Sequence, residues 1–215
     1  VPTELTTAGT DAALALLCLG VAASIWRCRR ADPWKAGIWL WVLALLAAAS
    51  ALGAVAHGLD LSSPARAVLW YPLYLCLGLA VALFALGALL DWLGPAASRR
   101  ALPWAVFCAL VFSLVTPLLG GSFLLFIGYE AAAMGVSLCI YLRLAWTGRL
   151  HGSGRIAAAI LLTLLAAAVQ ASDLAVTILL PFDHNGLFHL LQIAAVAVLG
   201  RGLRESLKFR LKAEE

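Results

Sequence analysis

The chain has 215 residues, of which 64% are hydrophobic and only 12% are charged. Because soluble globular domains carry about 25% charged residues, this composition excludes that class and predicts an integral membrane protein. The net charge of +4 is then expected to reflect membrane topology and the anionic inner leaflet, so it gives no reason to expect nucleic-acid binding.

Seven apolar segments follow one another along the chain, each close to the length of about 20 residues that a membrane-spanning helix requires. They cover residues 9–26, 36–57, 66–92, 102–119, 121–146, 156–180 and 185–204. Residues that favour helix ends lie between them: Asp32-Pro33, Ser62-Ser63-Pro64, Gly94-Pro95, Gly120-Gly121, Gly152-Ser153-Gly154 and Pro181. The sequence therefore predicts a seven-span domain over residues 1–204 and a charged tail over residues 205–215.

Basic residues are distributed unevenly among the gaps between these segments. Of the 15 Lys and Arg residues, all except Arg66 fall in alternate gaps or in the tail. These are Arg27, Arg29, Arg30, Lys35, Arg99, Arg100, Arg143, Arg149, Arg155, Arg201, Arg204, Lys208, Arg210 and Lys212. Because Lys and Arg near span ends are retained on the cytoplasmic side, the predicted fold class is an all-α seven-transmembrane-helix bundle with its N-terminus outside and its C-terminus cytoplasmic. We expect it in a bacterial inner (plasma) membrane.

Polar residues gather at the opposite, predicted outer ends of four segments. They are Ser50, His57 and Asp60 for the second segment, Tyr129 and Glu130 for the fifth, Gln170 and Asp173 for the sixth, and His184, Asn185, His189 and Gln192 for the seventh. Ionisable groups inside a membrane are costly, usually face the bundle interior and mark functional sites by default. We therefore expect one polar layer in the outer half, with Glu130 and Asp173 facing the interior.

Simpler structural roles remain open for these residues. A membrane histidine can join two helices through a hydrogen bond. Asp183 and Asn185 can cap the seventh helix, because a short polar side chain accepts hydrogen bonds from the first turn. Asp60 can cap a helix end or pair with Arg66.

Three histidines at one depth favour a zinc site. Neutral imidazoles bind zinc well, and three protein ligands leave a fourth position for water. The metal makes hydroxide available at neutral pH and polarises a carbonyl group. The expected ligands are His57, His184 and His189, and Asp60 or Asp173 is placed to accept the proton of the water.

With Ser50 and His57 late in the second segment, Asp60 soon after, and two histidines opening the seventh, the chain resembles the superfamily of alkaline ceramidases and adiponectin-receptor-like proteins. The resemblance implies an intramembrane zinc on three histidines, hydrolysis of a lipid amide, and accessory roles for Ser50 and Asp60.

The chain departs from that pattern in three places. Gly53 stands where the family has Ser. The motif HNGLFH separates the two histidines by five residues, a rotation of about 140° on a helix. The third segment has no Asp near its outer end.

The sequence thus predicts a zinc-dependent membrane hydrolase that acts on a lipid amide or ester. A non-enzymatic receptor or sensor that binds a small ligand in the same pocket is the alternative. A proton-coupled transporter using Glu130 and Asp173 is a third reading, although no inverted repeat of broken spans supports it. Membrane lipid is the expected partner, and the substrate and oligomeric state are left open.

Overall fold

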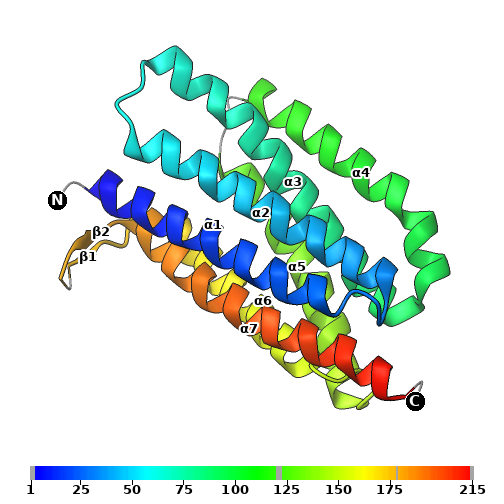
Figure 1. The fold of residues 1–215 in the computed structure, drawn as a ribbon. Coiled ribbons are helices and arrows are strands. Elements are labelled where there is room, and N and C mark those ends of the chain that lie inside the picture. The colour runs from blue at the N-terminus through cyan, green and yellow to red at the C-terminus, as the bar shows by residue number, and fades with distance from the viewer. Residues whose placement is uncertain (1–2, 120–122, 178, 214–215) are drawn as a thin grey trace.

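The computed structural model describes residues 3–119, 123–177 and 179–213. These residues form seven helices and one short hairpin (Figure 1). The elements are α1 (Thr3–Arg27), α2 (Pro33–Gly58), α3 (Ser63–Leu93), α4 (Pro95–Leu118), α5 (Phe123–Trp146), α6 (Ser153–Gln170), β1 (Val176–Thr177), β2 (Pro181–Phe182) and α7 (His184–Ala213). Each of the seven helices is long and apolar enough to cross a membrane, and the predicted all-helical, seven-helix architecture is confirmed.

Proline and capping residues set several helix beginnings. Pro33 occupies the first turn of α2, and the Asp32 side chain accepts a hydrogen bond of 2.9 Å from the backbone N–H of Lys35. Proline suits a first turn because a backbone N–H at that position would have no partner within the helix. α4 likewise begins at Pro95, after Gly94 with a φ of 86°. The predicted break at Gly120-Gly121 lies outside the described residues.

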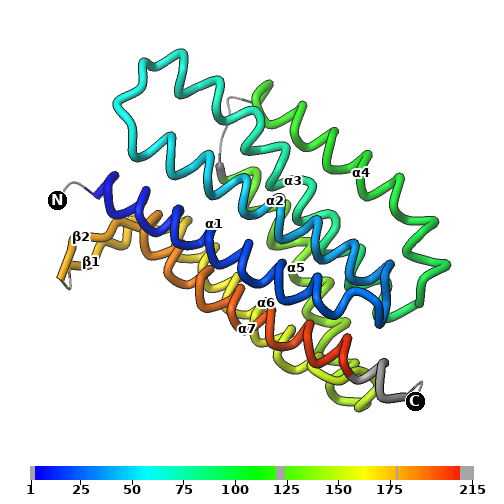
Figure 2. The backbone as a smooth tube through the Cα atoms, in the orientation of Figure 1, coloured from blue at the N-terminus to red at the C-terminus, as the bar shows by residue number. Residues whose placement is uncertain are grey.

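Six of the helices form a closed ring. Contacts run from α1 to α2, α2 to α3, α3 to α5, α5 to α6, α6 to α7 and α7 back to α1. α4 packs against α3 on the outside of this ring (Figure 1). The chain ends lie at opposite ends of the bundle, as the tube in Figure 2 shows and as seven crossings require.

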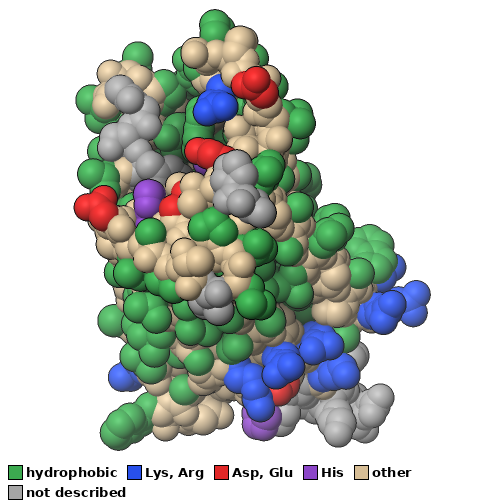
Figure 3. Space-filling view, turned by 90° about the vertical axis from the view of Figure 1, so that its left-hand side faces the viewer, with side chains coloured by type: hydrophobic (Ala, Val, Ile, Leu, Met, Phe, Trp, Pro, Cys, Tyr) green, Lys and Arg blue, Asp and Glu red, His purple; other side chains and the backbone are tan. Residues whose placement is uncertain are grey.

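The two ends of the bundle carry different side chains. We call the end where α1 terminates at Arg27 the arginine end, and the end where α2 finishes and α7 begins, with His57 and His184, the histidine end. Most of the Lys and Arg side chains on the face drawn in Figure 3 gather toward its lower part.

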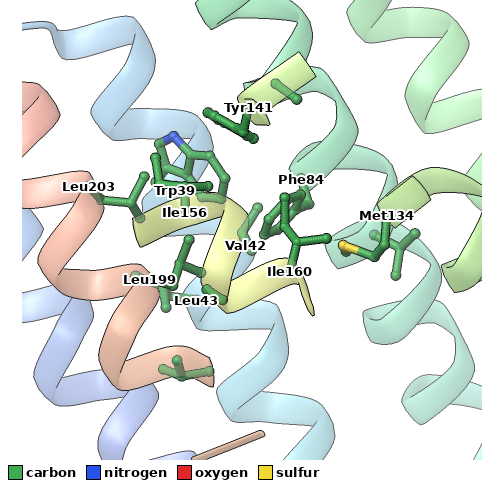
Figure 4. Close-up of a cluster of buried hydrophobic side chains, with 14 of the residues drawn as sticks. Trp39, Val42, Leu43, Phe84, Met134, Tyr141, Ile156, Ile160, Leu199 and Leu203 are labelled. Carbon is green, nitrogen blue, oxygen red and sulfur yellow. The ribbon is translucent and has the colours of Figure 1, made fainter. Parts of the chain in front are cut away.

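A close-packed apolar cluster joins all six ring helices, and Figure 4 labels members of it from α2, α3, α5, α6 and α7. The rings of Trp39 and Phe84 meet edge to face at 4.9 Å between centroids. Gly87 permits this packing, because a Cβ there would lie 2.8 Å from the Trp39 indole. Within lipid, close backbone and side-chain approach is what holds helices together.

The prediction for the sixth segment is wrong at its end. α6 ends at Gln170, ten residues before the predicted end at 180, and an antiparallel pairing of Val176–Thr177 with Pro181–Phe182 follows. The Ser172 hydroxyl donates to the carbonyl of Val169 and accepts from the N–H of Leu174. Such local bonds compete with a helix. Asp173 is therefore exposed in the segment after α6 instead of facing the bundle interior.

Candidate functional site

A cavity of about 430 Å³ lies inside the ring of helices. Small-molecule sites usually enclose about 300–1,000 Å³, so the space suits a ligand. All six ring helices contribute to its wall, and no described residue of α4 does. The ring, rather than the whole bundle, therefore forms the site.

Polar side chains line the cavity mainly toward the histidine end, and apolar side chains line the remainder. The polar set is Asp11, Ser50, His57, Glu130, Thr163, Gln170, His184, Asn185, His189 and Gln192. Val42, Phe84 and Leu199 belong to the apolar wall and also to the packed cluster of Figure 4. The cavity is amphipathic along the bundle axis.

His189 and Asp11 form a buried pair between α7 and α1. The His189 Nε2 lies 3.3 Å from the Asp11 carboxylate, with both side chains almost fully buried. Asp11 is not among the predicted site residues, although an acid inside an apolar segment is itself a signal of an interior polar site.

The two ring nitrogens of His189 have different neighbours. The Thr10 hydroxyl lies 2.9 Å from the carbonyl of Thr7, to which it donates, and 3.2 Å from Nδ1 of His189. With Nδ1 in contact with Thr10, Nε2 is the nitrogen that faces Asp11 and that could bind a metal.

Gly53 makes room for the Asp11 carboxylate. A Cβ at position 53 would lie 2.6 Å from an Asp11 carboxylate oxygen, so a larger residue forces the acid to move. This is the position where the resemblance predicts a serine. In this chain an acid from α1 occupies that space instead.

His57 lies nearer the mouth of the cavity. Its Nδ1 is 2.6 Å from the Glu4 carboxylate, and the exposed fractions of these side chains are 20% for His57 and 57% for Glu4. The His57 ring also meets Trp70 edge to face at 6.5 Å between centroids. Because an exposed ion pair contributes about 1 kcal/mol or less, this contact orients His57 more than it stabilises the fold.

Glu130 faces the interior, as predicted, and is 5% exposed. Its Oε2 has no hydrogen-bond partner among the described residues. Two polar side chains of the predicted polar layer are engaged elsewhere: the Tyr129 hydroxyl donates to the carbonyl of Gly78, and the Gln170 amide donates to Asn185 at 2.5 Å. Glu130 thus presents an unpaired carboxyl oxygen in the cavity wall.

Two further predicted site residues do not reach the cavity. Tyr129 stacks on Phe112 of α4, with ring centroids 4.6 Å apart. It points away from the cavity because neighbouring helix residues are rotated by about 100°. Asp60 is exposed in the loop after α2. Both predictions of a place in the pocket are wrong.

The beginning of α7 combines capping with lining. Asp183 accepts from the backbone N–H of Gly186 at 2.9 Å and from the Thr7 hydroxyl at 3.1 Å, which confirms its capping role. Asn185 accepts from Gln170 instead of capping. Gln192, deeper along α7, accepts a hydrogen bond from Thr163 at 3.1 Å.

The predicted zinc ligands His57, His184 and His189 line the same cavity. Within the described part of the chain, however, no three His, Cys, Asp or Glu side chains are grouped closely enough to hold a metal ion. The ring nitrogens of His57 and His189 suit a metal, but the arrangement requires side-chain movement to bind one. The zinc site stays a prediction.

A second polar cluster, missed in the sequence, lies at the arginine end. Lys35 and Asp91 are 2% and 3% exposed and form an ion pair of 2.5 Å. Lys35 also donates to the Ser206 hydroxyl, and the Tyr141 hydroxyl donates to Asp91 at 2.9 Å. The cluster joins α2, α3, α5 and α7. Lys35, counted above among the basic residues of the alternate gaps, is therefore a buried residue.

Comparison with curated proteins and with solved structures gives no match for the chain. One family model, described as a family of unknown function, matches residues 6–208. This range includes the ring helices, the cavity and the cluster at the arginine end. The chain therefore belongs to that family of unknown function, DUF6962.

Proposed function

We propose that this chain is an integral membrane protein that binds an amphiphilic small molecule inside its ring of helices, as a receptor or sensor. The observation that carries the proposal is the cavity of about 430 Å³, polar toward the histidine end and apolar beyond it. A ligand with a polar head and a short alkyl portion matches this separation of polar and apolar walls.

The ligand carries a hydrogen-bonding group in its head. Glu130 Oε2 is buried without a partner among the described residues, and an unpaired buried polar group costs about 1–3 kcal/mol. A hydroxyl of the ligand, which can donate or accept, removes that cost. The cavity wall contains acids, amides, histidines and hydroxyls but no described Lys or Arg, so an anionic head is disfavoured.

In the membrane, the histidine end faces outside and the arginine end faces the cytoplasm. The basic residues of the alternate gaps support this orientation, because Lys and Arg are retained on the cytoplasmic side. The bacterial inner membrane is the proposed location. The head of the ligand then lies in the outer half of the bilayer.

A photoreactive decanol that carries a diazirine in its alkyl chain tests ligand binding. We expect cross-links on cavity-lining peptides of purified protein in nanodiscs. Ala159 lines the cavity and neighbouring Ala158 is exposed on α6. Ala159→Leu should abolish the interior cross-links, whereas Ala158→Leu should retain them. Equal labelling of both variants, with both melting like the native protein, contradicts the proposal.

A zinc-dependent hydrolase of a lipid amide or ester is the second candidate. It is favoured by the Nδ1 hydrogen bonds of His57 and His189, which leave each Nε2 as a potential ligand atom, as partners of metal-binding histidines do. Bound zinc would supply an activated water and polarise a carbonyl. His184 would complete the ligand set, and Ser50 lies buried in the cavity wall.

Metal analysis separates the two candidates. The hydrolase requires about one zinc per chain in protein purified without chelators, and loss of that zinc in His57→Ala. His151→Ala, in the turn before α6 at the arginine end, should keep it. Zinc-free native protein that still binds the photoreactive decanol rejects the hydrolase and leaves the receptor.

A further inference from the structure

A groove of about 210 Å³ runs between α1 and α7 on the outside of the ring, toward the arginine end. No described residue lines both this groove and the cavity. On α1 its wall includes Gly20, Val21 and Ser24, and on α7 it includes Gly200, Arg201 and Arg204. The groove is thus a separate feature that the proposed ligand site does not use.

Two glycines shape the groove in different ways. A Cβ on Gly200 would lie 2.7 Å from a methyl carbon of Val21, so Gly200 allows the two helices to approach closely and form the floor. A Cβ on Gly20 would meet nothing within 4 Å. The space beside Gly20 is open, and a thin apolar chain fits there.

The charge of the groove is concentrated at one end. Arg201 and Arg204 are one turn apart on α7, and both are exposed. The structure records no acidic partner for either arginine within the described residues, whereas Arg155 nearby pairs with Glu205. Two unpaired guanidinium groups beside an apolar groove are complementary to a molecule that has an anionic head and a long apolar chain.

We propose that this groove binds an anionic phospholipid of the surrounding membrane, with its phosphate on Arg201 and Arg204 and an acyl chain beside Gly20. Guanidinium groups bind phosphate oxygens through paired, charge-assisted hydrogen bonds. Basic pockets between helices on the cytoplasmic side are suited to anionic lipid heads. The inference rests on the proposed membrane insertion and orientation but not on any ligand in the cavity.

Native mass spectrometry of the full chain, released from mixed micelles of phosphatidylglycerol and phosphatidylcholine, tests the groove. We expect retention of phosphatidylglycerol over phosphatidylcholine. Arg201→Gln with Arg204→Gln should lower that retention at least about tenfold, the scale of one charge-assisted hydrogen bond. Arg99→Gln with Arg100→Gln, the same charge change at the same end of the bundle, is the matched control.

A second pair of variants tests the apolar part of the site. Gly20→Leu fills the groove, whereas Gly9→Leu adds the same side chain to α1 where a Cβ also meets nothing within 4 Å. Only Gly20→Leu should reduce retention, with unchanged melting in both. Equal retention of the two lipids by the native protein, equal loss in both arginine pairs, or full retention by Gly20→Leu overturns the proposal. None of these outcomes alters the cross-linking result for the cavity.

Discussion

At the residue scale, the position of Asp11 depends on the missing side chain of Gly53. The carboxylate fills the space that a Cβ would take, and from there it reaches the His189 imidazole. A single glycine on α2 therefore controls a contact between α1 and α7. The polar layer is defined by packing as much as by hydrogen bonding.

Gly53→Ser should displace Asp11 and lower the melting temperature of the purified protein. Overpacking of this kind costs about 1–3 kcal/mol, and the Asp11–His189 contact is lost with it. Gly135→Ser on α5 is the control, because a Cβ there meets nothing within 4 Å. Thermal melting in one detergent compares the three proteins, and an unchanged melting temperature for Gly53→Ser contradicts the argument.

Glu130→Gln should retain the fold and weaken ligand binding by up to about tenfold, because a typical hydrogen bond contributes about 0.5–1.5 kcal/mol. The amide keeps the shape of the side chain but replaces an acceptor oxygen by a donor. Asp173→Asn, on an exposed residue after α6, should leave cross-linking by the photoreactive decanol unchanged. Equal cross-linking in both variants would show that Glu130 does not contact the ligand.

Much of this site was predictable at the level of residue type. His57, His189 and Glu130 are ionisable residues near or inside apolar segments, and all three line the cavity. The direction in which each side chain points was harder to predict. Tyr129 and Glu130 are adjacent, so only one of them can face inward.

At the scale of elements, Lys35 and Asp91 are found at helix ends that do not favour their charges. Lys35 lies in the first turn of α2 and Asp91 lies near the end of α3. Cations are disfavoured near helix N-termini and anions near C-termini. Their own pairing, with Tyr141 and Ser206, therefore holds these two residues inside the bundle.

Lys35→Met should destabilise the protein by about 3–5 kcal/mol, because it leaves the Asp91 carboxylate buried without its cation. The double variant Lys35→Met with Asp91→Leu should recover much of that loss. Unfolding in mixed micelles measures both. Arg155→Met removes an exposed pair with Glu205 and should cost about 1 kcal/mol or less. A double variant as unstable as Lys35→Met rules out charge burial as the cause.

Helix ends are predicted from the sequence in some places and not in others. The breaks at Asp32-Pro33 and Gly94-Pro95 coincide with real helix beginnings, because proline restricts the chain locally. The end of α6 had no proline or glycine signal, since the next proline is Pro181 and residues 174–180 are mostly apolar. The hydrogen bonds of Ser172 compete with the helix at this point, and Asp173 consequently lies outside the site.

At the scale of the whole molecule, the order of helices around the ring follows from tertiary packing. The sequence predicts seven helices but contains no pattern that places α4 outside and joins α3 directly to α5. That arrangement encloses the cavity with six helices. It also explains why α4 has few buried residues for its length.

The orientation of the bundle can be tested with single cysteines in a cysteine-free background. Ser62→Cys lies in the loop after α2 at the histidine end, and Thr147→Cys lies in the turn after α5 at the arginine end. Both positions are exposed. A membrane-impermeant maleimide should label Ser62→Cys in intact cells, and Thr147→Cys only after permeabilisation.

The expected labelling pattern follows from the basic residues at the arginine end. Lys35 is not counted among them, because it is buried. Lys and Arg near span ends resist transfer across the membrane, and the anionic inner leaflet attracts each by about 1 kcal/mol. Only Arg66 opposes them from the other end. If Thr147→Cys alone were labelled in intact cells, the orientation of the bundle in the membrane would be the reverse of the proposed one. The ligand head would then lie in the cytoplasmic half, and Arg201 and Arg204 would face the outer leaflet.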